Sequence, residues 1–301
     1  MARAFEGPQT TRTSARLDSG QGMYAHATAG RGGGAVVSQP APRAAPDRGR
    51  NFPLMVHCHL RWDFVWQRPQ QLFSRLAAHH AVLFVEDPMP GEGDAHLDVS
   101  EPYANVVRLV PRLPHDAPAD TDAQWRLLLP LIEQALQRHP LLAGRFANPV
   151  QWFYSPMSAP VLLGRFGARG TVYDCMDELS AFRGAPPELV EREVELMCRA
   201  NLVFTGGYSL YEAKRQRHDN AHPFPSSVDV EHFAAARRPQ HDPDDQAEIP
   251  HPRLGFYGVI DERLDIALIE QVARMRPDWQ IVLVGPVVKI DPAELPQRDN
   301  I

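Results

Sequence analysis

The sequence contains little cysteine and almost no lysine, and it lacks any long apolar run. Three cysteines among 301 residues, an odd and low number, argue against a disulfide-stapled secreted scaffold and fit a reducing compartment. No stretch approaches the ~18 apolar residues that a membrane span needs, and the first residues lack the apolar core of a secretory signal. A net charge of −6 disfavours general nucleic-acid binding. We therefore expect a cytoplasmic protein that binds no nucleic acid.

Residues 1–50 form a low-complexity segment in which Gly, Ala, Pro and Arg dominate. Such a segment cannot bury enough apolar surface to offset its ordering entropy, so we predict a disordered tail. Its Arg-, Ser- and Ala-rich composition also leaves a transit peptide open. The glycine-rich run at 30–34 is not a dinucleotide loop, because no strand precedes it and no amphipathic helix follows it.

Short apolar runs alternate with helical patterns from residue 53 onward. This alternation predicts a parallel sheet covered on both faces, in a doubly wound, Rossmann-like domain over residues 51–236. Pro130 falls inside one predicted helix and is expected to kink or split it. The expected strands are 53–57, 81–85, 105–110, 150–154, 171–173, 202–205 and 221–224, and the expected helices are 69–76, 121–139, 159–166, 187–199 and one from about 209.

Residues 237–253 are polar and proline-rich, and we interpret them as an interdomain linker. The alternation then restarts with strands at 254–258 and 280–285 around a helix at 264–275. Residues 254–301 amount to under half of the roughly 100 residues that a doubly wound domain needs. Either this half-domain docks on the first domain or the chain is a fragment, and we favour a fragment.

Six segments occur in an order that carries a family resemblance. The most recognisable feature is the pattern Val228-Asp229-x-x-x-Phe233. Together the segments resemble a bacterial group of GT-B-fold glycosyltransferases, of group 1/4 type, related to the glycogen-synthase-like clan. They are His59–Leu72, Tyr173–Leu179, Leu202–Leu210, Phe224–Phe233, Gly255–Asp265 and Val284–Pro286.

The resemblance implies two facing Rossmann-like domains, of which the first binds the acceptor and the second binds a nucleotide-diphosphate sugar as co-substrate. It implies transfer without a metal or other cofactor, and a saccharide or lipid-linked acceptor in cell-surface polysaccharide synthesis. Peripheral docking on the inner face of the cell membrane would follow. It also implies that the donor domain is truncated, since the family continues past Ile301 with residues that hold the donor's ribose and sugar.

The donor-binding candidates lie in the loops that follow the last two strands. A leaving diphosphate can be stabilised by backbone N–H groups at a helix N-terminus and by cations. Gly258 ends a strand just before a helix, and Arg263 and Lys289 lie in or near this loop and the next. A tight turn with a solvated arginine is the alternative, and the acids Asp261 and Glu262 weaken the phosphate hypothesis.

The catalytic candidate is Asp177, which follows the fifth predicted strand. Transfer with inversion at the anomeric carbon needs a carboxylate to deprotonate the acceptor hydroxyl. Asp174 or Glu178 could equally be this acid, and Asp177 could instead cap a turn. Transfer with retention needs no such base, and the sequence does not decide the stereochemistry.

The acceptor-binding candidates are Trp62, Arg68, Gly206 and Gly207. Aromatic faces stack on sugar rings and arginine binds acidic sugars or phosphates. For Trp62 and Arg68 a place in the core is an equal alternative. The two glycines could hold an anion or simply let the chain turn into the next helix.

Three other functions compete with this hypothesis. A metal-dependent glycosyltransferase needs Asp-x-Asp after a strand, but Asp242-Pro243-Asp244 lies in the linker. An NAD-dependent enzyme needs a glycine motif after its first strand, and His57–Arg61 contains no glycine. His57 and His59 lack a third ligand at metal-binding spacing, so we expect no metal site. A non-catalytic sugar-binding or scaffold protein derived from a glycosyltransferase stays open.

Overall fold

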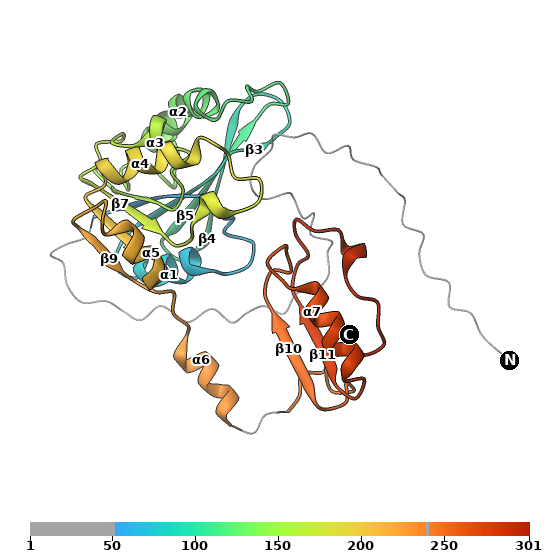
Figure 1. Cartoon of the computed structure of the whole chain (residues 1–301). Helices are drawn as coiled ribbons and strands as arrows, with labels where there is room; N and C mark the ends of the chain where they lie inside the picture. Colours follow the sequence, from blue (N-terminus) through green and yellow to red (C-terminus); the bar gives the residue numbers. More distant parts are fainter. Residues whose placement is uncertain (1–51, 239–240) are drawn as a thin grey trace.

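The computed structural model describes residues 52–238 and 241–301, which form two separate parallel sheets (Figure 1). The larger sheet has nine strands in the order β3-β5-β2-β1-β6-β7-β8-β9, with β4 paired to β5. The smaller sheet pairs β10 with β11. The predicted tail at 1–50, with its glycine-rich run, and residues 239–240 of the predicted linker lie outside the described residues.

The elements follow the predicted alternation closely. The strands are β1 (Leu54–Cys58), β2 (Val82–Glu86), β3 (Met89–Pro90), β4 (His96–Tyr103), β5 (Val106–Leu113), β6 (Val150–Phe153), β7 (Gly170–Cys175), β8 (Leu202–Thr205), β9 (Ala221–Pro223), β10 (Arg253–Tyr257) and β11 (Gln280–Val284). The helices are α1 (Arg68–Leu76), α2 (Thr121–Arg138), α3 (Ala159–Leu162), α4 (Leu189–Arg199), α5 (Tyr208–Lys214), α6 (Val230–Ala234) and α7 (Ile266–Met275).

The strand order reverses direction next to β1. The chain runs from β1 outward to β2 and β5, and then returns to build β6, β7, β8 and β9 on the other side of β1. Ligands of open parallel sheets bind beyond the carboxyl ends of the strands, near such a reversal. The loops after β1, β6 and β7 are therefore where a ligand of this sheet is expected.

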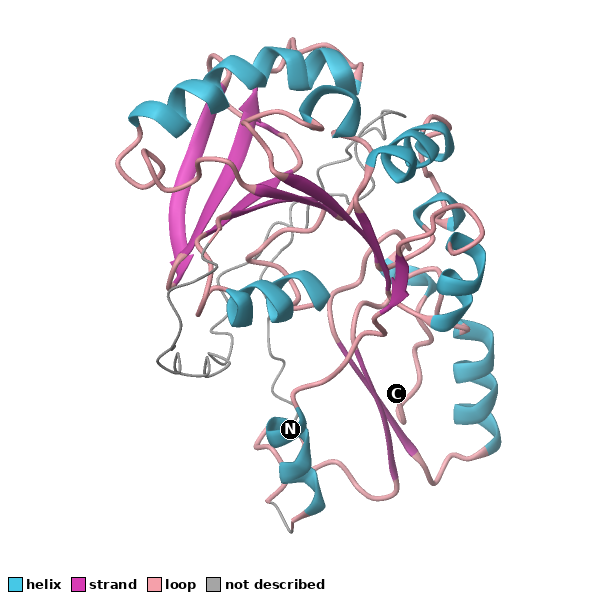
Figure 2. Cartoon of the chain, turned by 90° about the vertical axis from the view of Figure 1, so that its left-hand side faces the viewer, coloured by secondary structure: helices cyan, strands magenta, loops and turns pink. Residues whose placement is uncertain are grey.

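Helices cover both faces of the large sheet, as the buried apolar strands require (Figure 2). On one face Met55, Leu83 and Leu109 pack against Trp125 and Leu128 of α2. The same face continues over β6, β7 and β8, where α4 packs. On the opposite face α1 covers the strands with Phe73, which makes an edge contact with Phe84. The predicted doubly wound α/β fold is confirmed.

Two local features differ from the sequence expectation. The antiparallel strand β4 was not predicted, because its outer face is exposed and only Leu97 and Val99 mark its inner face. Pro130 does not split its helix, since α2 runs unbroken to Arg138. Pro130 is exposed, so the carbonyl left without a helical donor can bind water, while Leu128 and Ile132 keep the helix packed on the sheet.

Two glycines join the ends of the small sheet. Gly258 and Gly285 adopt φ of 147° and 153°, values that side chains rarely allow. A Cβ at Gly285 would lie 1.7 Å from the Gly258 carbonyl oxygen, so no other residue fits there. The Gly258 N–H donates to the Val284 carbonyl at 3.0 Å, and Ile260 N–H donates to Pro286 at 2.9 Å. The loops after β10 and β11 are thereby held side by side.

Candidate functional site

Three loops from the two sheets meet at one place. We call them the β7 loop (residues 176–184), the β10 loop (residues 258–265) and the β11 loop (residues 285–291). The Arg183 guanidinium donates to the Lys289 carbonyl. The Phe182 ring centroid lies 5.5 Å from Cζ of Arg263 and 5.0 Å from Nζ of Lys289. The sequence-predicted base and two of the predicted donor ligands are therefore brought together.

The three candidate acids after β7 have different environments. Asp174 is fully buried, and both of its carboxylate oxygens accept hydrogen bonds from Arg68 Nε at 3.1 Å, so no substrate can reach it. Glu178 accepts from Lys214 and Ser180, and these bonds outweigh desolvation and lower the pKa of its carboxyl. Burial instead raises the pKa of Asp177, while the charge of Arg263 opposes the rise. Among these three acids, only Asp177 combines a raised pKa with a side chain that is partly exposed.

A buried charge network holds the β7 loop from below. Lys214, at the end of α5, is 3 % exposed and donates to both carboxylate oxygens of Glu193 at 2.8 Å and to Glu178 at 3.0 Å. The Tyr173 hydroxyl donates to Glu193 at 2.8 Å. Because Glu178 is the neighbour of Asp177, Lys214 fixes the backbone that carries the candidate base.

The two candidate cations already have acidic partners. The Arg263 guanidinium donates to both carboxylate oxygens of Asp261, at 2.6 Å from NH2 and 2.9 Å from Nε. Lys289 Nζ lies 3.6 Å from Glu262. A diphosphate would have to bind beside these carboxylates, which is the arrangement that the sequence analysis counted against a phosphate site. The helix α7 offers less, because the Asp265 carboxylate accepts the Leu268 N–H at its N-terminus.

Gly258 lies in this group of loops, but its own amide is already used by Val284. Its contribution is a backbone conformation that lets β10 turn beside β11, not a hydrogen bond to a phosphate. The structure therefore fits the alternative of a tight turn at Gly258. The hypothesis of a donor site then depends on Arg263 and Lys289.

Trp62 lies in the core of the first sheet, and Arg68 lies beside it with its side chain 11% exposed. Trp62 is 2 % exposed and makes edge contacts with Phe84 and Trp66, so it presents no face to a sugar. Arg68 neutralises Asp174 and also donates to the Phe224 carbonyl. Both residues have the structural role that the sequence left open as the alternative.

Gly206 and Gly207 lie where β8 turns into α5. A Cβ at Gly206 would lie 2.3 Å from the Met176 carbonyl oxygen, and the Gly206 N–H donates to Cys175 at 2.9 Å. Gly206 is thus required for β8 to pass close under the β7 loop. A Cβ at Gly207 would meet nothing within 4 Å. Gly206 therefore fits the alternative in which the glycine lets the chain turn into the next helix. Within the described residues, neither glycine contacts Arg263 or Lys289.

Sequence reasoning missed Phe182, Arg183 and Lys214. Phe182 and Arg183 follow the recognised segment that ends at Leu179, and an isolated Phe-Arg pair carries no pattern. Lys214 is one of only two lysines in the chain, and its position at the end of a helix suggests a solvated side chain. A buried lysine becomes visible only when Glu193 is placed opposite it.

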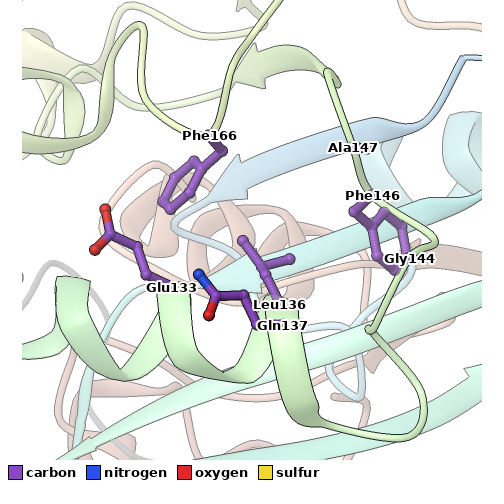
Figure 3. A pocket seen from close by; sticks show the side chains of 7 residues that line it. All are labelled: Glu133, Leu136, Gln137, Gly144, Phe146, Ala147 and Phe166. Atoms are coloured by element: carbon purple, nitrogen blue, oxygen red, sulfur yellow. The ribbon is translucent and has the colours of Figure 1, made fainter.

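The pocket in Figure 3 lies at the amino-terminal ends of β6 and β7. It has a volume of about 320 Å³ and is formed by the end of α2, the residues before β6 and the residue Phe166 before β7. Asp177 follows β7 and therefore lies at the opposite, carboxyl-terminal ends of the strands. Within 52–238 and 241–301 no helix is long and apolar enough to cross a membrane. The same residues contain no group of three or more His, Cys, Asp or Glu that could hold a metal ion.

Two Rossmann-like sheets whose loops face each other define the GT-B architecture, and comparison with solved structures shows the same fold. The sucrose-phosphate synthase of Thermosynechococcus elongatus is 15% identical, with a TM-score of 0.52 over 83% of this chain and 65% of that chain. An apo structure of OtsA is 11% identical, with a TM-score of 0.51 over 79% of this chain and 66% of that one.

A third structure, described as trehalose-6-phosphate from E. coli bound with UDP-2-fluoro glucose, is 12% identical with a TM-score of 0.48 over 81% of this chain and 66% of that chain. The chain thus spans just under two thirds of the length of these structures. No family model and no curated protein matches the sequence. The resemblance to GT-B glycosyltransferases is confirmed at the level of the fold.

Proposed function

We propose that this chain is the acceptor domain and the first part of the donor domain of a glycosyltransferase. The reaction moves a sugar from a nucleotide-diphosphate sugar to a hydroxyl of a saccharide or lipid-linked acceptor. One observation carries the proposal: Arg263 of the second sheet lies 5.5 Å from the ring of Phe182, which follows Asp177 by five residues in the β7 loop of the first sheet. The charge of Arg263 also opposes the burial that raises the pKa of Asp177. A candidate base of the first sheet and a cation of the second sheet therefore lie close together.

The chemistry follows from this arrangement. The acceptor hydroxyl loses its proton to the Asp177 carboxylate as its oxygen forms a bond to the anomeric carbon. The bond from that carbon to the diphosphate oxygen breaks, and the departing negative charge is stabilised by Arg263 and Lys289. These cations support a reaction without a metal ion. Because Asp177 acts as a base, the proposal requires inversion at the anomeric carbon.

The acceptor and the location rest on the sequence resemblance. We place the reaction on the cytoplasmic side of the cell, at the inner face of the membrane, in the synthesis of a cell-surface polysaccharide. Co-sedimentation of the chain with vesicles that carry a lipid-linked saccharide, compared with vesicles of the same lipids alone, tests this placement. Equal binding to both would argue against a lipid-linked acceptor.

Transfer and hydrolysis assays of a protein that carries the whole donor domain, with UDP-, GDP- and TDP-sugars in the presence of a chelator, test the reaction, because this chain alone holds only the first part of that domain and is expected to be inactive by itself. We expect activity with at least one donor, and an inverted anomeric configuration in the product. Asp177→Asn should lower turnover about 100-fold or more while nucleotide binding stays within about twofold. Asp219→Asn, an exposed acid just before β9 at the other edge of the sheet, is the matched control and should keep full activity.

Four results would each contradict a part of this function. Loss of all activity with the chelator would remove metal independence. A retained configuration, or unchanged turnover in Asp177→Asn, would remove Asp177 as the base. Binding of saccharides without transfer or hydrolysis of any donor would favour the non-catalytic sugar-binding alternative.

A further inference from the structure

The β7 loop places an aromatic ring against both cations of the proposed donor site. Phe182 is half-buried and directly follows a short 3-10 turn at Leu179–Ala181. Arg263 approaches its ring from the β10 loop at 5.5 Å and Lys289 from the β11 loop at 5.0 Å, both measured to the ring centroid. A cation within about 6 Å of a ring face is attracted by the negative face of the π-system. One side chain of the first sheet thus contacts a cation on each loop of the second.

The ring differs in its effect from the carboxylates that also contact these cations. Asp261 and Glu262 hold Arg263 and Lys289, but they neutralise charge that a diphosphate needs. A neutral ring orders a long, flexible cationic side chain without cancelling its charge. Ordering before binding lowers the entropy cost of the ligand contact. The Phe182 ring is therefore the contact that can prepare these cations for an anion.

The β7 loop is fixed on both sides of Phe182. Glu178 is held by the buried Lys214 at 3.0 Å on the side of the first sheet. Arg183 donates to the Lys289 carbonyl on the side of the second sheet. A ring carried by such a loop has a defined position with respect to both cations.

We propose that Phe182 is a positioning residue that preorganises Arg263 and Lys289 for the diphosphate of the donor. This inference rests on the proposed function, because it presumes that the two cations bind that diphosphate. Phe182 makes no contact with the reacting atoms in this proposal. Its effect is on the affinity for the diphosphate, through the two side chains that it orders.

The composition of the chain offers a direct probe. Lys214 and Lys289 are the only lysines, and Lys214 is 3 % exposed, so reductive methylation with ¹³C labels Lys289 and the amino terminus. Methyl groups on Lys289 Nζ lie over the ring and should be shifted upfield by its ring current. Lys289→Arg assigns the signal, and the methylated amino terminus serves as the internal reference, because Lys214 is shielded from the reagent in its buried pair with Glu193.

The variants are Phe182→Leu, which removes the ring, and Phe182→Tyr, which keeps it. Tyr211→Leu is the matched control, since it removes a ring that lies 5.5 Å from the Arg215 guanidinium on α5. The full chain is titrated with inorganic pyrophosphate and with UDP at low ionic strength. Far-UV circular dichroism confirms that each variant is folded.

We expect Phe182→Leu to abolish the upfield shift of Lys289 and to weaken diphosphate binding about five- to tenfold, as loss of two ring contacts predicts. Phe182→Tyr and Tyr211→Leu should bind like the wild type. An unshifted Lys289 signal in the wild type, or unchanged affinity in Phe182→Leu, would overturn the role of Phe182 alone. A shifted Lys289 signal with no diphosphate binding by the wild type would instead overturn the donor site itself, and with it this inference.

Discussion

Replacing Lys214 by methionine should destabilise the first sheet strongly. The lysine is 3 % exposed and Glu193 is 5 % exposed, and two 2.8 Å hydrogen bonds join them. Methionine matches the volume of the lysine stem but leaves the Glu193 carboxylate buried without its cation. The structure therefore predicts a loss that arises from an uncompensated charge, not from a cavity.

The size of the loss can be bounded from the contacts. Removing one partner of a buried ion pair costs about 3–5 kcal/mol. The Tyr173 hydroxyl still donates to Glu193 at 2.8 Å, and Arg217 remains at 3.6 Å on a side chain that is 40% exposed. These two groups compensate part of the charge, so we expect about 3 kcal/mol for Lys214→Met. Adding Glu193→Gln removes the charge but keeps an acceptor for Tyr173, so the double variant should regain at least about half of the loss.

Urea unfolding followed by tryptophan fluorescence measures both variants, because four of the five tryptophans belong to the large sheet and the elements packed on it. The pKa of Lys214 is raised, since hydrogen bonds to Glu193 outweigh its desolvation. A raised pKa of a cation contributes stability below the unfolded pKa, near 10.5, and loses it as the pH rises through the folded value. The wild type should therefore keep its advantage over Lys214→Met up to pH 9. A loss under about 1 kcal/mol, or a double variant no more stable than Lys214→Met, would refute the reasoning.

Three smaller changes test other parts of the structure. Gly206→Ala places a Cβ 2.3 Å from the Met176 carbonyl oxygen, so it should lower the free energy of unfolding by about 1–3 kcal/mol and should also lower turnover. Gly207→Ala has open space around its Cβ and should match the wild type in both assays. Equal behaviour of the two variants would contradict the close approach at Gly206. Burial raises the pKa of Asp87 to about 6, so its charge costs stability as the pH rises from about 4 to 6, and Asp87→Asn should add about 1–2 kcal/mol at pH 7.5 but nothing at pH 4 in urea titrations. Pro130→Ala, on the exposed face of α2, should raise the free energy of unfolding by about 1–3 kcal/mol, and a decrease would show that the proline fits the helix.

The strands and helices of the large sheet could be predicted because their residue patterns are local. The buried run Leu54–Cys58 and the helix opened by Pro69 each contain their own signal. The fold class followed from their alternation. The strand β4 escaped because it lies at the edge and buries only one face, where the pattern is carried by Leu97 and Val99. The predicted break at Pro130 was wrong because a proline on the exposed face of a helix leaves a carbonyl that water can satisfy, and the sequence rule does not consider which face is exposed.

The candidate site could be predicted only in part. The sequence placed Asp177 after a strand, but it did not separate Asp177 from Glu178 or Asp174. That choice depends on Lys214, which lies 36 residues beyond Glu178, and on Arg68, which lies 106 residues before Asp174. Partners at such separations set the pKa of each acid and leave no trace in its neighbours. The same holds for Phe182, whose two cations belong to another sheet.

The β7 loop connects the candidate base of the first sheet with the cations on the loops of the second sheet. Asp177 and Phe182 lie five residues apart in one loop, so the candidate base and the ring against the donor cations share a backbone. Lys214 holds this loop through Glu178, Gly206 leaves no space beneath Met176, and Arg183 ties its far end to Lys289. A loop held at these points keeps the candidate base and the ring in one fixed arrangement. Because Arg263 and Lys289 would also stabilise the departing charge in the proposed reaction, a change at these candidate cations should alter turnover as well as donor affinity.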